Sequence, residues 1–135
     1  MANNKLVIKS AVREYTTRSF YNFFKYFWSS VEASEYEDNW HIEMVCNELQ
    51  QRFEQYQENI IPATELQDLI FNLPPGCSKS LMVSVFFPAW VWLINPAAKI
   101  ITYSYSYKVA EELSGKSLRL LMSEEYSEIL SLIHI

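Results

Sequence analysis

Glycine is nearly missing from this chain of 135 residues, which contains only two glycines. Folds built from many short strands depend on glycine at their tight turns, so an all-β fold is disfavoured. Cysteine is equally scarce. Cys46 and Cys77 have no further cysteine nearby and no metal-ligand spacing, which predicts two reduced thiols in an intracellular protein.

Long apolar runs are also lacking, and this argues against a membrane protein. The strongest candidate is residues 81–94, LMVSVFFPAWVWLI, which Pro88 interrupts. A spanning helix needs about 20 apolar residues, so this shorter run predicts a buried helix. No cleavable signal opens the chain, and we expect a location in the cytoplasm.

Excess positive charge is absent too, because the formal net charge of the chain is −5. This charge disfavours a wholly cationic nucleic-acid binder, although a local basic patch stays open.

Hydrophobic residues make up 50% of the chain and charged residues 20%, which predicts one folded domain with a core. Residues 1–16 are predicted to be a flexible N-terminal tail. Two helices should follow, the first from about Arg18 and the second capped by Asp38 or Asn39. Their apolar positions recur at helical spacing: Phe20, Phe23, Phe24, Phe27 and Val31, then Ile42, Val45, Cys46, Leu49, Phe53 and Tyr56.

The apolar period changes after Pro62. Residues 68–73, DLIFNL, and residues 98–106, AKIITYSYS, have the composition of buried strands. A long apolar helix, residues 79–94, lies between them, and a further helix is expected around residues 109–121. This order predicts an α/β fold with a parallel sheet of the P-loop NTPase type, preceded by two N-terminal helices.

Two stretches approximate the phosphate-binding motif G-x-x-x-x-G-K-[ST]. Residues 110–117, AEELSGKS, match it more closely, but they fall within a predicted helix and carry two glutamates. Residues 72–80, NLPPGCSKS, have Leu73 and Ser78 in place of the glycines. They nevertheless join a predicted strand to a predicted helix, where free N–H groups and the helix dipole favour an anion. We therefore place the candidate site at Gly76, Cys77, Ser78, Lys79 and Ser80.

The chain resembles the large terminase subunit of tailed bacteriophages, an ATP-driven DNA-packaging motor. The stretches that carry the resemblance are FYNFFKYFW (20–28), WHIEMVCNELQ (40–50), NLPPGCSKS (72–80), VSVFFPAWVWLINP (83–96), KIITYSYS (99–106) and, more weakly, LSGKSLRLLMSEEY (113–126). The double proline before the loop and FPAW in the following helix are the most specific features. The family often has PPRHGKS in this loop, so Gly76, Cys77 and Ser78 depart from its Arg, His and Gly.

The resemblance implies an ATP-binding portion of such a motor, with ATP and Mg²⁺ as cofactors. Lys79 would contact the β- and γ-phosphates as the catalytic lysine, and Ser80 would bind the metal. Trp40 and His41 would lie near the adenine, although a core aromatic and a helix-cap residue are equally simple interpretations. The implied partners are double-stranded viral DNA, the portal protein and the small terminase subunit, in the cytoplasm of a bacterial host, with a possible homo-oligomer.

No apolar strand ending in Asp-Glu follows Ser80, and hydrolysis requires such carboxylates. Residues 17–135 are therefore predicted to be the N-terminal part of a terminase-like ATPase domain, truncated before its second catalytic motif and without a nuclease domain. The chain alone should bind nucleotide weakly and not turn it over. Two alternatives stay open: a fragment of another P-loop ATPase, or a small non-enzymatic, prophage-encoded interaction protein that docks a partner through its aromatic helices.

Overall fold

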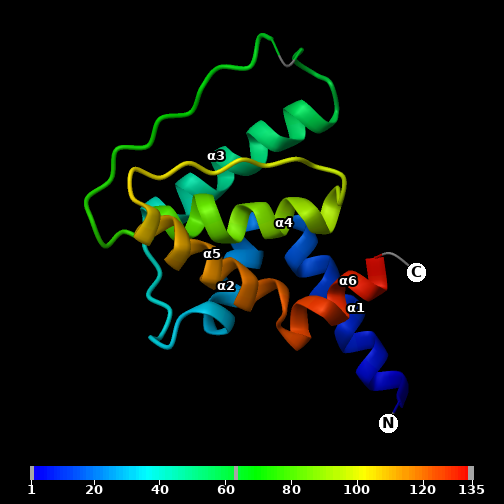
Figure 1. The fold of residues 1–135 in the computed structure, drawn as a ribbon. Helices are drawn as coiled ribbons and strands as arrows, with labels where there is room; N and C mark the ends of the chain where they lie inside the picture. Colours follow the sequence, from blue (N-terminus) through cyan, green and yellow to red (C-terminus); the bar gives the residue numbers. More distant parts are fainter. Residues whose placement is uncertain (1, 63, 134–135) are drawn as a thin grey trace.

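The protein folds as a bundle of helices in a computed structural model that describes residues 2–62 and 64–133 (Figure 1). In chain order the helical elements are α1 (Ala2–Arg18), α2 (Phe20–Val31), α3 (Trp40–Gln57), the π-helix η1 (Leu81–Phe86), α4 (Phe87–Ile94), α5 (Tyr107–Leu121) and α6 (Glu124–Ile133). The π-helix and α4 run on continuously. They lie against α5 and α2, while α2 also packs on α1 and α3, and α6 packs on α1.

Helix α2 forms the centre of the core, because its five apolar positions face one side of the helix. Phe20, Phe23, Phe24, Phe27 and Val31 are all buried, as their spacing predicts. Ser19 caps the helix by accepting a hydrogen bond from the Asn22 N–H at 3.3 Å. Each buried phenylalanine contributes about 1.5–3 kcal/mol relative to an exposed one. The aromatic side of α2 is therefore used within the core and is not presented to a partner.

Helix α1 includes residues 2–16 of the stretch that the sequence predicts as a flexible tail, residues 1–16. Its C-terminal end is held by the core, since the Thr16 carbonyl accepts a hydrogen bond from the Trp90 indole at 3.1 Å. Nearer its N-terminus, Lys9 Nζ lies 2.7 Å from Glu128 Oε1 of α6. The polar composition of α1 fits a helix that packs along one edge only, with Leu6, Val7 and Ile8 more than half exposed.

The predicted parallel sheet is wrong, because no strand occurs among residues 2–62 and 64–133. Residues 68–73 and 98–105 run as single extended segments over the helices, green and yellow in Figure 1. Leu69, Phe71 and Leu73 alternate inward with a period of two and pack against the core. The side-chain pattern of a strand is thus present, but a strand also needs a hydrogen-bonded neighbour, and neither segment has one.

The long apolar helix predicted for residues 79–94 is confirmed, but its first half is a π-helix. Pro88 explains this, because proline has no N–H and its ring clashes with the carbonyl four residues earlier, that of Ser84. The backbone hydrogen bonds shift by one residue, so that the Phe87 N–H donates to the Met82 carbonyl five residues earlier, as in a π-helix.

Within the described residues, no helix has both the length and the apolar character required to cross a bilayer.

Candidate functional site

The loop of residues 76–80 turns sharply through two left-handed residues. Gly76 has φ 86° and Ser78 has φ 57°. Ser78 occupies the place where the phosphate-loop motif has its second glycine, and it adopts a conformation that glycine adopts without strain. Holding a non-glycine residue in this left-handed backbone conformation costs about 1–3 kcal/mol. The packing around the loop therefore imposes this turn on an unsuitable residue.

The loop ends at the beginning of a helix. The first helical bond runs from the Met82 N–H to the Ser78 carbonyl at 2.9 Å, and helical residues begin at Lys79. Within the described part of the chain, the N–H groups of residues 76–80 make no well-formed hydrogen bond to the backbone. A row of free donors at a helix N-terminus attracts anions. Lys79 Nζ makes only a long contact of 3.5 Å, to the Leu73 carbonyl, so its ammonium group is available to a ligand.

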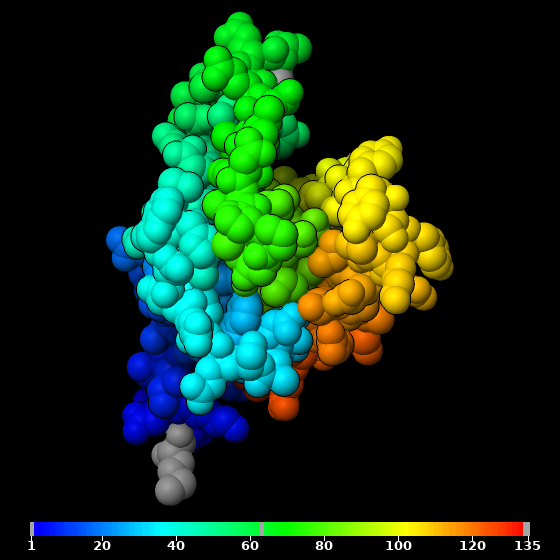
Figure 2. All heavy atoms as spheres, turned by 90° about the vertical axis from the view of Figure 1, so that its left-hand side faces the viewer, coloured from blue at the N-terminus to red at the C-terminus, as the bar shows by residue number. Residues whose placement is uncertain are grey.

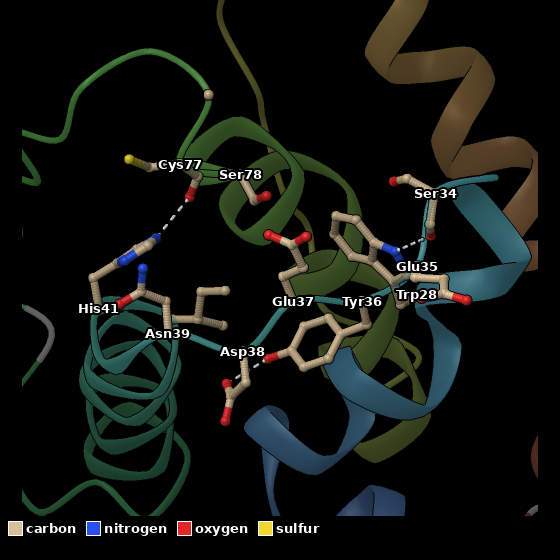
Figure 3. Close-up of a pocket in the computed structure, with 12 residues that line it drawn as sticks. Trp28, Ser34, Glu35, Tyr36, Glu37, Asp38, Asn39, His41, Cys77 and Ser78 are labelled. Carbon is tan, nitrogen blue, oxygen red and sulfur yellow. Dashed lines mark hydrogen bonds between the residues drawn. The ribbon is translucent and has the colours of Figure 1, made fainter.

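Helix α3 brings one of the other two predicted site residues, His41, to the loop, with Trp40 next to it. His41 Nε2 lies 3.2 Å from the Cys77 carbonyl, and because a carbonyl only accepts, Nε2 carries the proton (Figure 3). Trp40 sits beside His41, edge to face, with ring centroids 6.2 Å apart, and it is 73% exposed. Trp40 is therefore not a core aromatic. His41 is 35 positions or more from the loop in sequence, yet it contacts the loop in space.

Two adjoining cavities share the loop as a common wall. One, of about 510 Å³, lies between Cys77, His41 and the linker that joins α2 to α3 (Figure 3). The other, of about 530 Å³, is lined by Lys79, Ser80 and Glu32. Glu32 carries little net charge into this second cavity, because Lys116 Nζ lies 2.6 Å from its carboxylate. The second cavity therefore offers the more favourable surroundings for an anion.

The linker contributes residues that the sequence analysis did not single out. Its carboxylates at Glu35, Glu37 and Asp38 line the first cavity, and Figure 3 shows Glu37 extending into the space between Ser78 and Tyr36. These charges repel a phosphate there, which directs an anionic group toward Lys79. The acidic run of residues 29–38, SSVEASEYED, forms no part of the motif that located the loop. Its proximity to the loop depends on how α3 packs, and no local motif encodes it.

Tyr21 of helix α2 and Tyr36 of the linker both hold the linker residue Asp38. Tyr21 and Tyr36 both donate to the Asp38 carboxylate, with O···O distances of 2.6 to 2.8 Å. These hydrogen bonds hold the pKa of Asp38 below its usual range. Burial, followed by the bond to Asp38, raises the pKa of Tyr21 to about 12. Asp38 thus holds the linker in place, while Asn39 is the residue that precedes α3, without a side-chain cap bond.

We expect Asp38→Asn to lower the thermal midpoint at neutral pH and to have a smaller effect at pH 3. A carboxylate with a depressed pKa stabilises the fold above the unfolded pKa, and this stability is lost as the pH falls through the folded value. Thermal melts of both proteins at pH 7 and pH 3 test this, with Glu35→Gln as the control. A constant difference between wild type and Asp38→Asn at both pH values would contradict the role of the Asp38 charge.

The second motif match lies within helix α5, as predicted. Gly115, Lys116 and Ser117 are in the interior of Tyr107–Leu121, where backbone N–H groups are already used in the helix. The bond to the Glu32 carboxylate raises the pKa of Lys116. Lys116 therefore joins α5 to the end of α2, and this second match is not a phosphate loop.

The metal assignment to Ser80 rests on its hydroxyl alone. Ser80 is exposed at the helix start, and the described residues contain no group of three or more His, Cys, Asp or Glu side chains placed to hold a metal ion. Mg²⁺ bound with a nucleotide takes most of its ligands from phosphates and water, so one protein hydroxyl suits that role.

No protein-family model, curated protein or solved structure matches the chain.

Proposed function

We propose that this protein binds the phosphate groups of Mg²⁺-bound ATP at the loop of residues 76–80. The observation that carries the proposal is the juxtaposition of three features in one place. A left-handed turn leads into a helix N-terminus with free amides, Lys79 lies at that terminus without a close partner, and His41 contacts the same turn from another helix. Together these supply donors, charge and a neighbouring aromatic surface for a nucleotide.

The two cavities suggest how the nucleotide lies across the loop. Its phosphates fit the side of Lys79 and Ser80, where the ion pair with Lys116 offsets the charge of Glu32. The adenine would lie on the side of His41, where the exposed Trp40 indole beside that histidine would be its stacking partner. The carboxylates of the linker disfavour the reverse orientation. They also favour ATP that carries Mg²⁺ over free ATP, because the metal reduces the charge of the phosphates.

The resemblance to the large terminase subunit gives this binding a biological setting. We propose that the chain serves as the ATP-binding portion of a phage DNA-packaging motor, in which viral DNA, the portal protein and the small subunit would be partners. Turnover is not expected from this chain alone, since no strand-end carboxylate pair follows Ser80 in the sequence. The parallel sheet that the resemblance also implied is not part of this proposal.

The test is a titration with a fluorescent ATP analogue in the presence of Mg²⁺. Lys79→Ala removes a charge-assisted hydrogen bond worth about 1.5–3 kcal/mol and should weaken binding about tenfold or more. Lys99→Ala serves as the control, because Lys99 is exposed and lines neither of the two cavities beside the loop. Far-UV circular dichroism establishes that each variant keeps its helices.

Two results would overturn the proposal. One is the absence of saturable binding by the wild-type protein at millimolar nucleotide. The other is equal affinity of Lys79→Ala and Lys99→Ala, which would place any binding site elsewhere on the surface. Competition by ADP but not by adenosine would support phosphate recognition at the loop.

A further inference from the structure

The extended segment of residues 98–105 has the properties of an unpaired strand. Among the described residues, the backbone N–H and C=O groups of residues 99–105 make no hydrogen bond to another backbone group. A side chain holds the segment at its first residue, where the Ala98 carbonyl accepts a hydrogen bond from the Trp92 indole at 3.0 Å. Free backbone groups in an extended chain are a template for another strand.

The side chains of this segment alternate as they do in a strand. Ile100, Thr102 and Ser104 line a cavity against α5 and α4. The opposite side carries three large side chains into solvent: Ile101 is 78% exposed, Tyr103 91% and Tyr105 97%. Figure 2 shows the yellow segment as a lobe that projects from the body of the protein, apart from the green segment. A partner strand therefore has access to it.

We propose that residues 99–105 pair with the same residues of a second copy of this chain, as an antiparallel two-stranded ribbon centred on Thr102. The segment is self-complementary in this register. Ile101 of one copy faces Tyr103 of the other, which is a favourable pair of a β-branched and an aromatic side chain. Thr102 faces Thr102, also a favourable pair.

Charge favours the same arrangement. Lys99 is the single charged residue of residues 98–106. Opposite it in this register stands Tyr105 of the other copy, whose ring attracts a cation. The two lysines lie at opposite ends of the ribbon, so pairing brings no like charges together. The other residues of the segment are uncharged, and most have high strand propensity. Such a composition is typical of a segment that associates with copies of itself.

The other extended segment is a poorer candidate for self-pairing. Residues 68–73 turn Leu69, Phe71 and Leu73 against the core and leave Ile70 as the one exposed large apolar side chain. Asp68 at its start and Pro74 after its end shorten the usable edge. This segment therefore supplies a matched control for the first.

Sedimentation velocity over a range of protein concentrations tests the pairing. We expect a monomer–dimer equilibrium for the wild type. Thr102→Pro removes a backbone donor at the centre of the ribbon and should weaken dimerisation about tenfold or more. Ile70→Pro makes the same change in the other segment and should leave the dimer intact. Tyr103→Lys, at an exposed position, should weaken dimerisation without disturbing the fold.

Disulfide trapping tests the register in a Cys77→Ser background. Thr102→Cys should form a disulfide-linked dimer readily, because residue 102 faces itself. Ser104→Cys should not, since the two residues 104 would stand four positions apart, about 13 Å, beyond the reach of a disulfide. The proposal is overturned if the wild type is monomeric throughout, if Ile70→Pro and not Thr102→Pro removes the dimer, or if the two cysteine variants are trapped at equal rates.

Discussion

Trp90→Ala is expected to lower the free energy of unfolding by about 3–5 kcal/mol, the loss typical of a large aromatic removed from a core. Trp90 is 1% exposed and packs against Phe20 and Phe53, with ring centroids 5.6 and 5.5 Å away. Its indole N–H also binds the Thr16 carbonyl. The substitution therefore opens a cavity between α2, α3 and α4 and leaves a buried acceptor without its donor.

Trp40→Ala provides the matched control, because it makes the same chemical change at an exposed site. It should alter unfolding by no more than about 0.5 kcal/mol. If Trp40 stacks on adenine as proposed, however, it should weaken ATP binding by about 1–3 kcal/mol. Urea denaturation and nucleotide titration of both variants separate these effects. Equal losses of stability for Trp90→Ala and Trp40→Ala would contradict the packing described for α4.

Helices α2 and α3 were predictable because their apolar residues recur at a spacing that only a helix places on one side, whereas α1 was predicted as a tail and α6 was not predicted. All five positions predicted for α2 are buried, as are five of the six in α3, where only Tyr56 is exposed. The strands were not predictable by the same reasoning. Period-two alternation places Leu69, Phe71 and Leu73 inward whether or not a neighbouring strand exists. A sheet depends on pairing between distant segments, which a local pattern does not specify.

The candidate site was predictable in part. The loop could be located because Gly76, Lys79 and Ser80 stand at the start of an apolar helix, although the strand expected before them is an unpaired segment. The resemblance placed His41 near the adenine, but its contact with the Cys77 carbonyl was not predicted. The acidic wall at Glu37 and Asp38, and the ion pair between Glu32 and Lys116, depend on contacts between distant helices and linkers. Such contacts arise from the packing of the whole core.

Phe24→Ala is the substitution that connects this core most directly to the site, and it should cost about 3–5 kcal/mol. Phe24 is fully buried, and its ring centroid lies 5.5 Å from that of Trp28, 6.0 Å from Tyr36 and 4.7 Å from Phe86. Trp28 and Tyr36 form the wall of the cavity that faces the loop. Removing the ring beneath them should loosen that wall as well as the fold.

Phe24→Leu separates the two consequences, because it keeps most of the buried volume and should cost less than about 1.5 kcal/mol. At low temperature, where both variants are folded, ATP should bind Phe24→Leu nearly as well as wild type and Phe24→Ala more weakly. Urea denaturation gives the stabilities, and nucleotide titration gives the affinities. If Phe24→Ala is strongly destabilised yet binds ATP with wild-type affinity, the wall formed by Trp28 and Tyr36 takes no part in binding, and the nucleotide would contact only the loop and helix α3.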